Sequence, residues 1–152
     1  MVKIVGPKCL SNVIVHNYTS EEERAEEVQA LIDTGVNVNK ITQSPYPPLF
    51  LAFIYAGEPT LKALSSARGF DVNVKDDIGN TVLIYYADLG CKAEIKRILE
   101  FPGVNVYATD RFGKTAIEYA EKYPEIAELI QNYIARESNT SRTTAGTSMT
   151  TD

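Results

Sequence analysis

The sequence is poor in the side chains that form most catalytic and metal sites. Its 152 residues include two cysteines, Cys9 and Cys91, and one histidine, His16. Two thiols exclude a disulfide framework, and these few soft ligands do not make a zinc site. We therefore expect no metal and no cofactor. Isolated thiols suit a reducing compartment, so the predicted location is the cytoplasm.

Long apolar runs and basic clusters are also missing. The longest apolar run, Leu49–Ala56, is far shorter than the roughly 18 residues that a membrane-spanning helix needs. No apolar segment near the N-terminus leads to a small-residue cleavage site, which argues against a secretory signal. The net charge is −5, whereas nucleic acids and anionic membranes attract concentrated Lys and Arg. The sequence predicts neither of them as a partner.

What the sequence does contain is an ordinary globular composition and an internal repeat. Hydrophobic residues make up 44% and charged residues 23%, which argues against wholesale disorder. Residues 77–83 (DIGNTVL) align with residues 111–117 (RFGKTAI) at an offset of 34. A Val-Asn-Val motif recurs in the segments 35–38, 71–74 and 103–106, each time after an apolar-periodic stretch. Such self-similarity is typical of repeat architectures.

Each copy predicts a tight turn, a short helix, a break and a longer helix. The predicted pairs are Pro48–Ala56 with Thr60–Arg68, Thr81–Leu89 with Ala93–Glu100, and Lys114–Lys122 with Glu125–Ile134. In the first copy, Ser20–Asp33 is a helix that Ser20 can cap. The preceding segment, Cys9–Tyr18, is either a degenerate first helix, which we favour, or a strand, because Val13-Ile14-Val15 is β-branched.

These residues resemble the ankyrin repeat family, whose pattern is roughly Asp-x-x-Gly-x-Thr-Pro-Leu-His-x-Ala-Ala, then Gly, an apolar helix and a Val-Asn turn. Residues 76–83 (DDIGNTVL), followed by Ala87, Gly90, Ile95 and Val104-Asn105, match it well. The resemblance covers about residues 20–134. It implies an all-α fold, a solenoid of stacked helix-turn-helix pairs with projecting β-turn loops.

The resemblance implies one ankyrin-repeat domain over residues 1–136, with degenerate first and last repeats as caps. The repeats are approximately 8–39, 40–74, 75–107 and 108–136. The acidic stretch Glu21–Glu27 fits the solvated outer face of the first repeat. Residues 137–152 are predicted to be a disordered tail, because nine of the last fifteen residues are Ser or Thr.

The chain departs from the family pattern at two kinds of position. The histidine of the Thr-Pro-Leu-His tetrapeptide is missing in every copy, and Glu118 stands in its place in the last one. Tyr86 occupies a position that is normally small, so its side chain must point somewhere roomy.

Two segments of the sequence could carry catalytic chemistry. Gly113-Lys114-Thr115 looks like the end of a phosphate loop, but Ala108 stands where that motif needs glycine. A Cys9/His16 dyad is the only enzymatic constellation left. The repeat explains the first segment fully and gives the second no support, so we expect no enzyme activity.

The sequence therefore predicts a non-catalytic module that binds another protein through turn tips and the concave face of the first helices. Alternatives within this prediction are a stoichiometric inhibitor of a kinase or other enzyme, and a microbial effector delivered into a host cell. A monomer is expected, and the nucleus is a second possible location. The predicted partner-binding residues are Tyr46, Tyr55, Asp77, Ile78, Asn80, Leu89, Arg111, Phe112, Lys114 and Tyr123.

Overall fold

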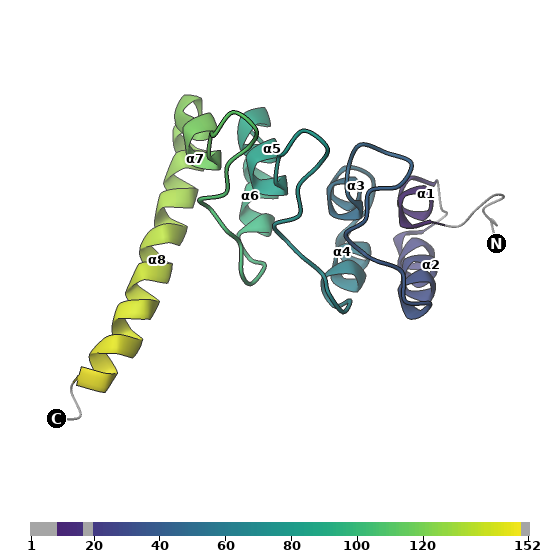
Figure 1. Ribbon diagram of the computed structural model, residues 1–152, viewed down its shortest axis with the longest axis horizontal. Coiled ribbons are helices and arrows are strands. Elements are labelled where there is room, and N and C mark those ends of the chain that lie inside the picture. Colours follow the sequence, from purple (N-terminus) through teal and green to yellow (C-terminus); the bar gives the residue numbers. More distant parts are fainter. Residues whose placement is uncertain (1–8, 17–19, 150–152) are drawn as a thin grey trace. The chain divides into compact units, whose positions relative to one another are not determined.

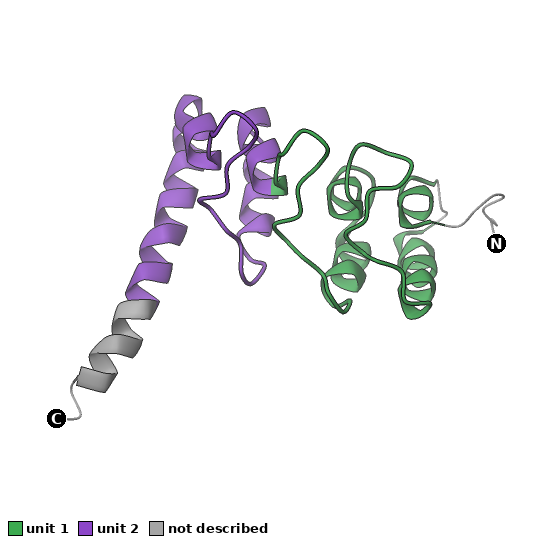
Figure 2. Cartoon of the chain, viewed as in Figure 1, with its two compact units in different colours: residues 1–82 green, residues 83–152 purple. Residues whose placement is uncertain are grey.

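The fold is all helical in the residues that the computed structural model describes, 9–16 and 20–149, with side chains described to residue 140. This confirms the all-α prediction. In Figure 1 the helices are α1 (Leu10–Val15), α2 (Glu21–Asp33), α3 (Pro48–Tyr55), α4 (Glu58–Ser65), α5 (Val82–Leu89), α6 (Lys92–Ile98), α7 (Ala116–Tyr119), the 3-10 helix η1 (Ala120–Lys122) and α8 (Pro124–Met149). The chain divides into two compact units, Met1–Val82 and Leu83–Asp152 (Figure 2), and each is described by itself.

The first unit consists of two helix pairs. Helix α1 packs against α2 and α3, and α4 packs against α2 and α3, so that α1 and α3 form one layer and α2 and α4 the other (Figure 1). Ile14, Phe50, Leu61 and Leu64 are almost completely buried between the layers. A single helix of six to thirteen residues cannot bury such side chains alone, so each pair depends on its neighbour.

The second unit is organised around α8. This helix packs against α6, α7 and η1. Its buried stripe is Ile126 and Ile130, four residues apart, and α6 contributes Ile95 and Ile98. The spacing of three and four residues places each pair of isoleucines on one face of its helix, as the periodicity predicts.

The internal repeat is a repeat of the backbone as well as of the sequence. The short helices α3, α5 and α7 begin at intervals of 34 residues. Gly35, Gly69 and Gly103 keep the same interval and have φ of 86°, 81° and 79°. This left-handed conformation suits glycine, which has no Cβ to clash. Gly35 directly follows the C-cap of α2, whereas Gly69 and Gly103 lie in the turns a few residues after α4 and α6. Three buried valines follow at the same spacing, Val38, Val72 and Val106.

The register of the Val-Asn-Val motifs differs from the sequence alignment in the middle copy. The side-chain oxygens of Asn37, Asp71 and Asn105 each accept a hydrogen bond from the amide two residues later, at 2.9, 2.9 and 3.0 Å. The equivalent of Asn37 and Asn105 is thus Asp71, and not Asn73. Asp and Asn form this turn equally well, so the identity of the residue misled the alignment.

The helix starts follow from local capping. Ser20 Oγ accepts from the Glu23 amide at 3.1 Å, as expected, and α2 carries three glutamates in its first turn. In the first copy the helix alternative is confirmed for Leu10–Val15, whereas residues 17 and 18 lie outside the described residues. Helix α4 begins at Glu58, two residues earlier than predicted, because Pro59 is well suited to a first turn.

The C-terminal segment differs from the expectation. Helix α8 continues to Met149 through most of the segment predicted to be a disordered tail, and residues 150–152 lie outside the described residues. A composition rich in Ser and Thr limits how much surface a segment can bury, and residues 137–140 are indeed exposed. Such a composition does not prevent the hydrogen bonds within a helix.

The side chain of Tyr86 does not point into open space. It is 5% exposed and meets Tyr85 edge to face at a centroid distance of 5.1 Å.

Candidate interaction surfaces

Each of the two turns that align at 34 residues is held by one buried aspartate. In the first unit, Asp76 Oδ1 accepts hydrogen bonds from the amides of Ile78 at 3.1 Å and Asn80 at 2.8 Å. The Asp76 amide donates to the Asn80 carbonyl at 2.9 Å, and Gly79 has a φ of 89°. The backbone of the turn is thereby closed by contacts within five residues.

The second unit repeats this arrangement around Asp110. Its Oδ1 accepts from the amides of Phe112 at 2.9 Å and Lys114 at 3.0 Å, and Gly113 has a φ of 76°. Its Oδ2 accepts from the Tyr119 hydroxyl. Burial alone would raise the pKa of Asp110, but the Tyr119 hydroxyl and the two amides hold that pKa below its ordinary value. The same hydrogen bond, with burial, raises the pKa of Tyr119 to about 12.

We expect Asp110→Ala to lower the free energy of unfolding by about 2 kcal/mol, because two amides and a hydroxyl lose their acceptor. Asp110→Asn keeps an oxygen for the amides and is expected to cost about half as much. Urea denaturation measures the free energy of unfolding of both variants.

Asp110 also predicts a dependence of stability on pH. A pKa that is lowered in the folded state stabilises the fold at pH values above the ordinary pKa, which is about 4. The advantage of the wild type over Asp110→Asn should therefore shrink as the pH falls from about 4 through the lowered pKa. Equal stability of the two proteins at pH 7 would contradict this.

The tips of these two turns carry exposed apolar side chains. Ile78 is 44% exposed and Phe112 is 70% exposed. Both side chains are therefore accessible at the turn tips, through which the sequence predicts partner binding. Around Phe112, the Arg111 guanidinium lies 4.8 Å from its ring centroid, and Lys114 Nζ lies 5.3 Å from the Tyr119 ring centroid. In the first unit, Asp77 is exposed and its amide donates to the Pro45 carbonyl of the preceding loop at 3.3 Å.

The remaining candidates divide into exposed and packed residues. Tyr55 and Leu89 end α3 and α5 and are 53% and 54% exposed. Tyr123, by contrast, is half-buried, and its ring lies where a Cβ on Gly90 would be only 2.6 Å from Cζ. Tyr46 is also half-buried and stacks on Phe50 at 5.9 Å. Tyr55, Leu89 and Tyr123 could contact a partner or pack between repeats. Tyr55 and Leu89 are open to solvent, whereas the Tyr123 ring packs within its own unit.

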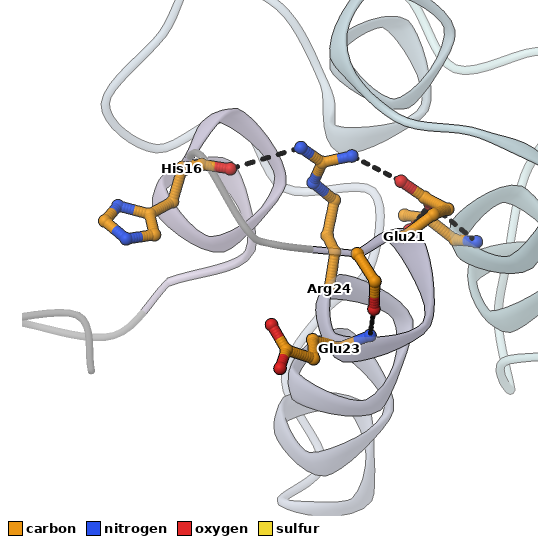
Figure 3. A network of polar contacts seen from close by, with 6 residues as sticks. His16, Glu21, Glu23 and Arg24 are labelled. Carbon is orange, nitrogen blue, oxygen red and sulfur yellow. Dashed lines mark hydrogen bonds and ion pairs between the residues drawn. The ribbon is translucent and has the colours of Figure 1, made fainter. Parts of the chain in front are cut away.

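Sequence reasoning missed a polar network that joins three helices of the first unit (Figure 3). Glu21, at the start of α2, accepts from the amide of Thr60 at 3.3 Å and from its hydroxyl. Glu21 also pairs with Arg24, whose Nη2 donates to the His16 carbonyl after α1 at 3.2 Å. Burial would raise the pKa of Glu21, but hydrogen bonds from Thr60 and Gly57 and the charge of Arg24 lower it.

This network corrects the prediction that the whole stretch Glu21–Glu27 is a solvated face. Helix α4 has no capping side chain of its own, since Gly57 is its N-cap. Glu21 supplies a carboxylate from 39 residues away, where the partial positive charge of the helix terminus favours an anion. A run of glutamates carries no signal of such a long-range partner. Glu22 and Glu26 are exposed as expected.

Helix α7 begins with a capping box, which the sequence could have predicted. Thr115 Oγ1 accepts from the Glu118 amide at 3.4 Å, and Glu118 Oε1 accepts from the Thr115 amide at 3.3 Å. The pattern Thr-x-x-Glu at a helix start is its signature. Glu118, which stands where the resembling family has histidine, therefore has a local structural role.

The Cys9/His16 pair is not favoured by the geometry. Cys9 is the N-cap of α1 and His16 its C-cap, which places their Cα atoms about 10 Å apart along the helix axis. The Cys9 thiol accepts a hydrogen bond from the Thr42 hydroxyl at 3.5 Å. Cys91 is half-buried, and burial raises the pKa of its thiol.

In the part of the chain that the structure describes, no group of three or more His, Cys, Asp or Glu side chains could hold a metal ion. None of the helices in that part is both long and apolar enough to cross a membrane. No family model matches the chain.

Proposed function

We propose that this chain is an ankyrin-type repeat protein that binds another protein through its turn tips and the exposed ends of its short helices. The observation that carries the proposal is the pair of aspartate-held turns that present Ile78 and Phe112 to solvent. Leaving a large apolar side chain in water is unfavourable, and contact with a partner would remove these two side chains from water.

The family assignment rests on several features that recur every 34 residues. These are the short helix starts, the left-handed glycines, the buried valines and the Asx turns. Turn, short helix and longer helix keep the same order in each copy. Stacking such pairs in a solenoid would give an extended recognition surface. The role is a binding one, without catalysis or a cofactor.

Phe112→Ala and Ile78→Ala are each expected to weaken partner binding by about 2 kcal/mol, or roughly thirtyfold, because exposed anchors of this kind carry most of the binding energy. Affinity purification from the native source, with mass spectrometry, identifies the partner, and calorimetry then measures each variant. Tyr107→Ala is the matched control, since Tyr107 is 66% exposed but lies outside the two tips.

The control shows whether a loss of binding is specific to the turn tips or follows from removing any exposed aromatic side chain. Binding that survives both tip variants, or that is lost only in Tyr107→Ala, places the contact elsewhere. Thermal melting of the three variants should match that of the wild type, because the three side chains are exposed and away from the core.

A further inference from the structure

The two aspartate-held turns have the same backbone but opposite charge. The first tip carries Asp77, Ile78 and Asn80, and the second carries Arg111, Phe112 and Lys114 at the equivalent positions. Both turns make the same hydrogen bonds from the buried aspartate to the amides two and four residues later. Since the first turn forms without cations, Arg111 and Lys114 are not needed to fold the second.

The carboxylates next to these cations are engaged in other contacts. Asp110 is 8% exposed and accepts three hydrogen bonds from its own turn and from Tyr119. Glu118 accepts from Thr115 in the capping box. Arg111 and Lys114 are both exposed, and the charge of Lys114 lies close enough to Asp110 to help lower the pKa of that carboxyl.

The aromatic rings position the two cations. Arg111 lies over Phe112 at 4.8 Å and Lys114 over Tyr119 at 5.3 Å. Stacking on a ring covers one face of a guanidinium and leaves its edge N–H groups free to donate to a carboxylate in a bidentate fork. The result is an apolar anchor flanked by two oriented positive charges, on a protein whose net charge is −5.

Resting on the proposed function, we propose that the second tip, Asp110–Lys114, binds an acidic segment of the partner protein. An apolar side chain of that segment contacts the Phe112 ring, and neighbouring Asp or Glu carboxylates pair with Arg111 and Lys114. On a protein of net charge −5, this tip places two cations beside an exposed ring, which favours an acidic segment at that place. The first tip, with Asp77 and Asn80, does not share this preference.

The test is to select peptides from a random phage-display library on the full-length protein. The affinity of the selected peptides, carrying a fluorescent label, is then measured by fluorescence. Selected peptides should be enriched in Asp and Glu beside an apolar residue. Arg111→Glu/Lys114→Glu should weaken their binding about tenfold or more, and Arg111→Gln/Lys114→Gln less. Lys40→Glu/Lys62→Glu makes the same change of net charge at exposed lysines of the first unit and should leave binding unchanged.

The outcomes distinguish this inference from the function on which it rests. Peptides without acidic enrichment, or acidic peptides that bind the Glu double variant equally, overturn the charge preference. If such peptides still need Phe112, the interaction module stands and only its partner chemistry falls. If no peptide depends on Phe112 or Ile78, the proposed function falls as well. A DNA oligonucleotide that displaces the peptides through Arg111 and Lys114 also overturns the inference, because the tip would then recognise phosphates.

Discussion

Glu21→Ala is expected to lower the free energy of unfolding by about 3 kcal/mol. The substitution removes the Glu21 carboxylate that pairs with the Arg24 guanidinium, whose side chain is 13% exposed. It also removes the acceptor of Thr60, which is fully buried, and the carboxylate at the start of α4. Chemical denaturation monitored by circular dichroism measures the loss. Partial solvent access of the pair keeps the effect at the lower end of the range for buried ion pairs.

Glu22→Ala is the matched control for this experiment. Glu22 is the next residue in the first turn of α2, but it is exposed. Like Glu21→Ala, Glu22→Ala removes a carboxylate that interacts with the dipole of α2, but it leaves the polar network intact. The free energy of unfolding is therefore expected to fall by less than about 0.5 kcal/mol. Similar losses for the two variants would mean that the network contributes little.

The network also gives a dependence on pH. The pKa of Glu21 is lowered in the folded protein, so its carboxylate stabilises the fold at pH values above the ordinary pKa. That contribution is lost as the pH falls through the lowered pKa. The difference in stability between the wild type and Glu21→Gln should accordingly be larger at pH 7 than at pH 3.

Gly90→Ala is expected to cost about 3 kcal/mol, the second large effect. Gly90 has a φ of 74°, a conformation that costs an L-residue roughly 1–2 kcal/mol. In addition, the new Cβ would lie 2.6 Å from Cζ and 2.7 Å from Cε1 of Tyr123, so the ring must move. Overpacking of this kind typically costs another 1–3 kcal/mol. Thermal unfolding of the full-length variant measures the combined loss of stability.

Gly103→Ala separates the two contributions. Gly103 has nearly the same φ, 79°, but nothing lies within 4 Å of a Cβ built there. It should therefore show the backbone cost alone, about 1–2 kcal/mol. The double variant Gly90→Ala/Tyr123→Ala relieves the clash, and its loss should be smaller than the sum of the two single losses. Strict additivity would show that the ring and the glycine do not interact.

Local signals were the part of this molecule that could be predicted. Ser20, Gly35 and the Pro47-Pro48 pair each act on the backbone within a few residues, and each lies at a helix end. The exposure of Phe112 also followed from its place in a turn. Such effects depend on local covalent geometry and hydrogen bonding, which a short window of sequence contains.

Contacts between distant segments could not be predicted in the same way. Glu21 and Thr60 are 39 residues apart, and a glutamate in an acidic run gives no indication of which helix terminus it meets. The packing of Tyr123 against Gly90 likewise depends on how η1 sits beside the end of α5. The continuation of α8 past residue 137 was missed because composition measures the capacity for burial and not helix length.

The aspartate-held turns separate the residues that build the loop from those that face outward. Asp110 and Gly113 supply the hydrogen bonds and the left-handed backbone, whereas the side chains of Arg111, Phe112 and Lys114 make none of these hydrogen bonds. Substitution at the outward positions therefore leaves the scaffold unchanged. A combinatorial library restricted to them, and to their counterparts in the first unit, should yield folded members with new specificities. Recognition in this protein can diverge without loss of stability.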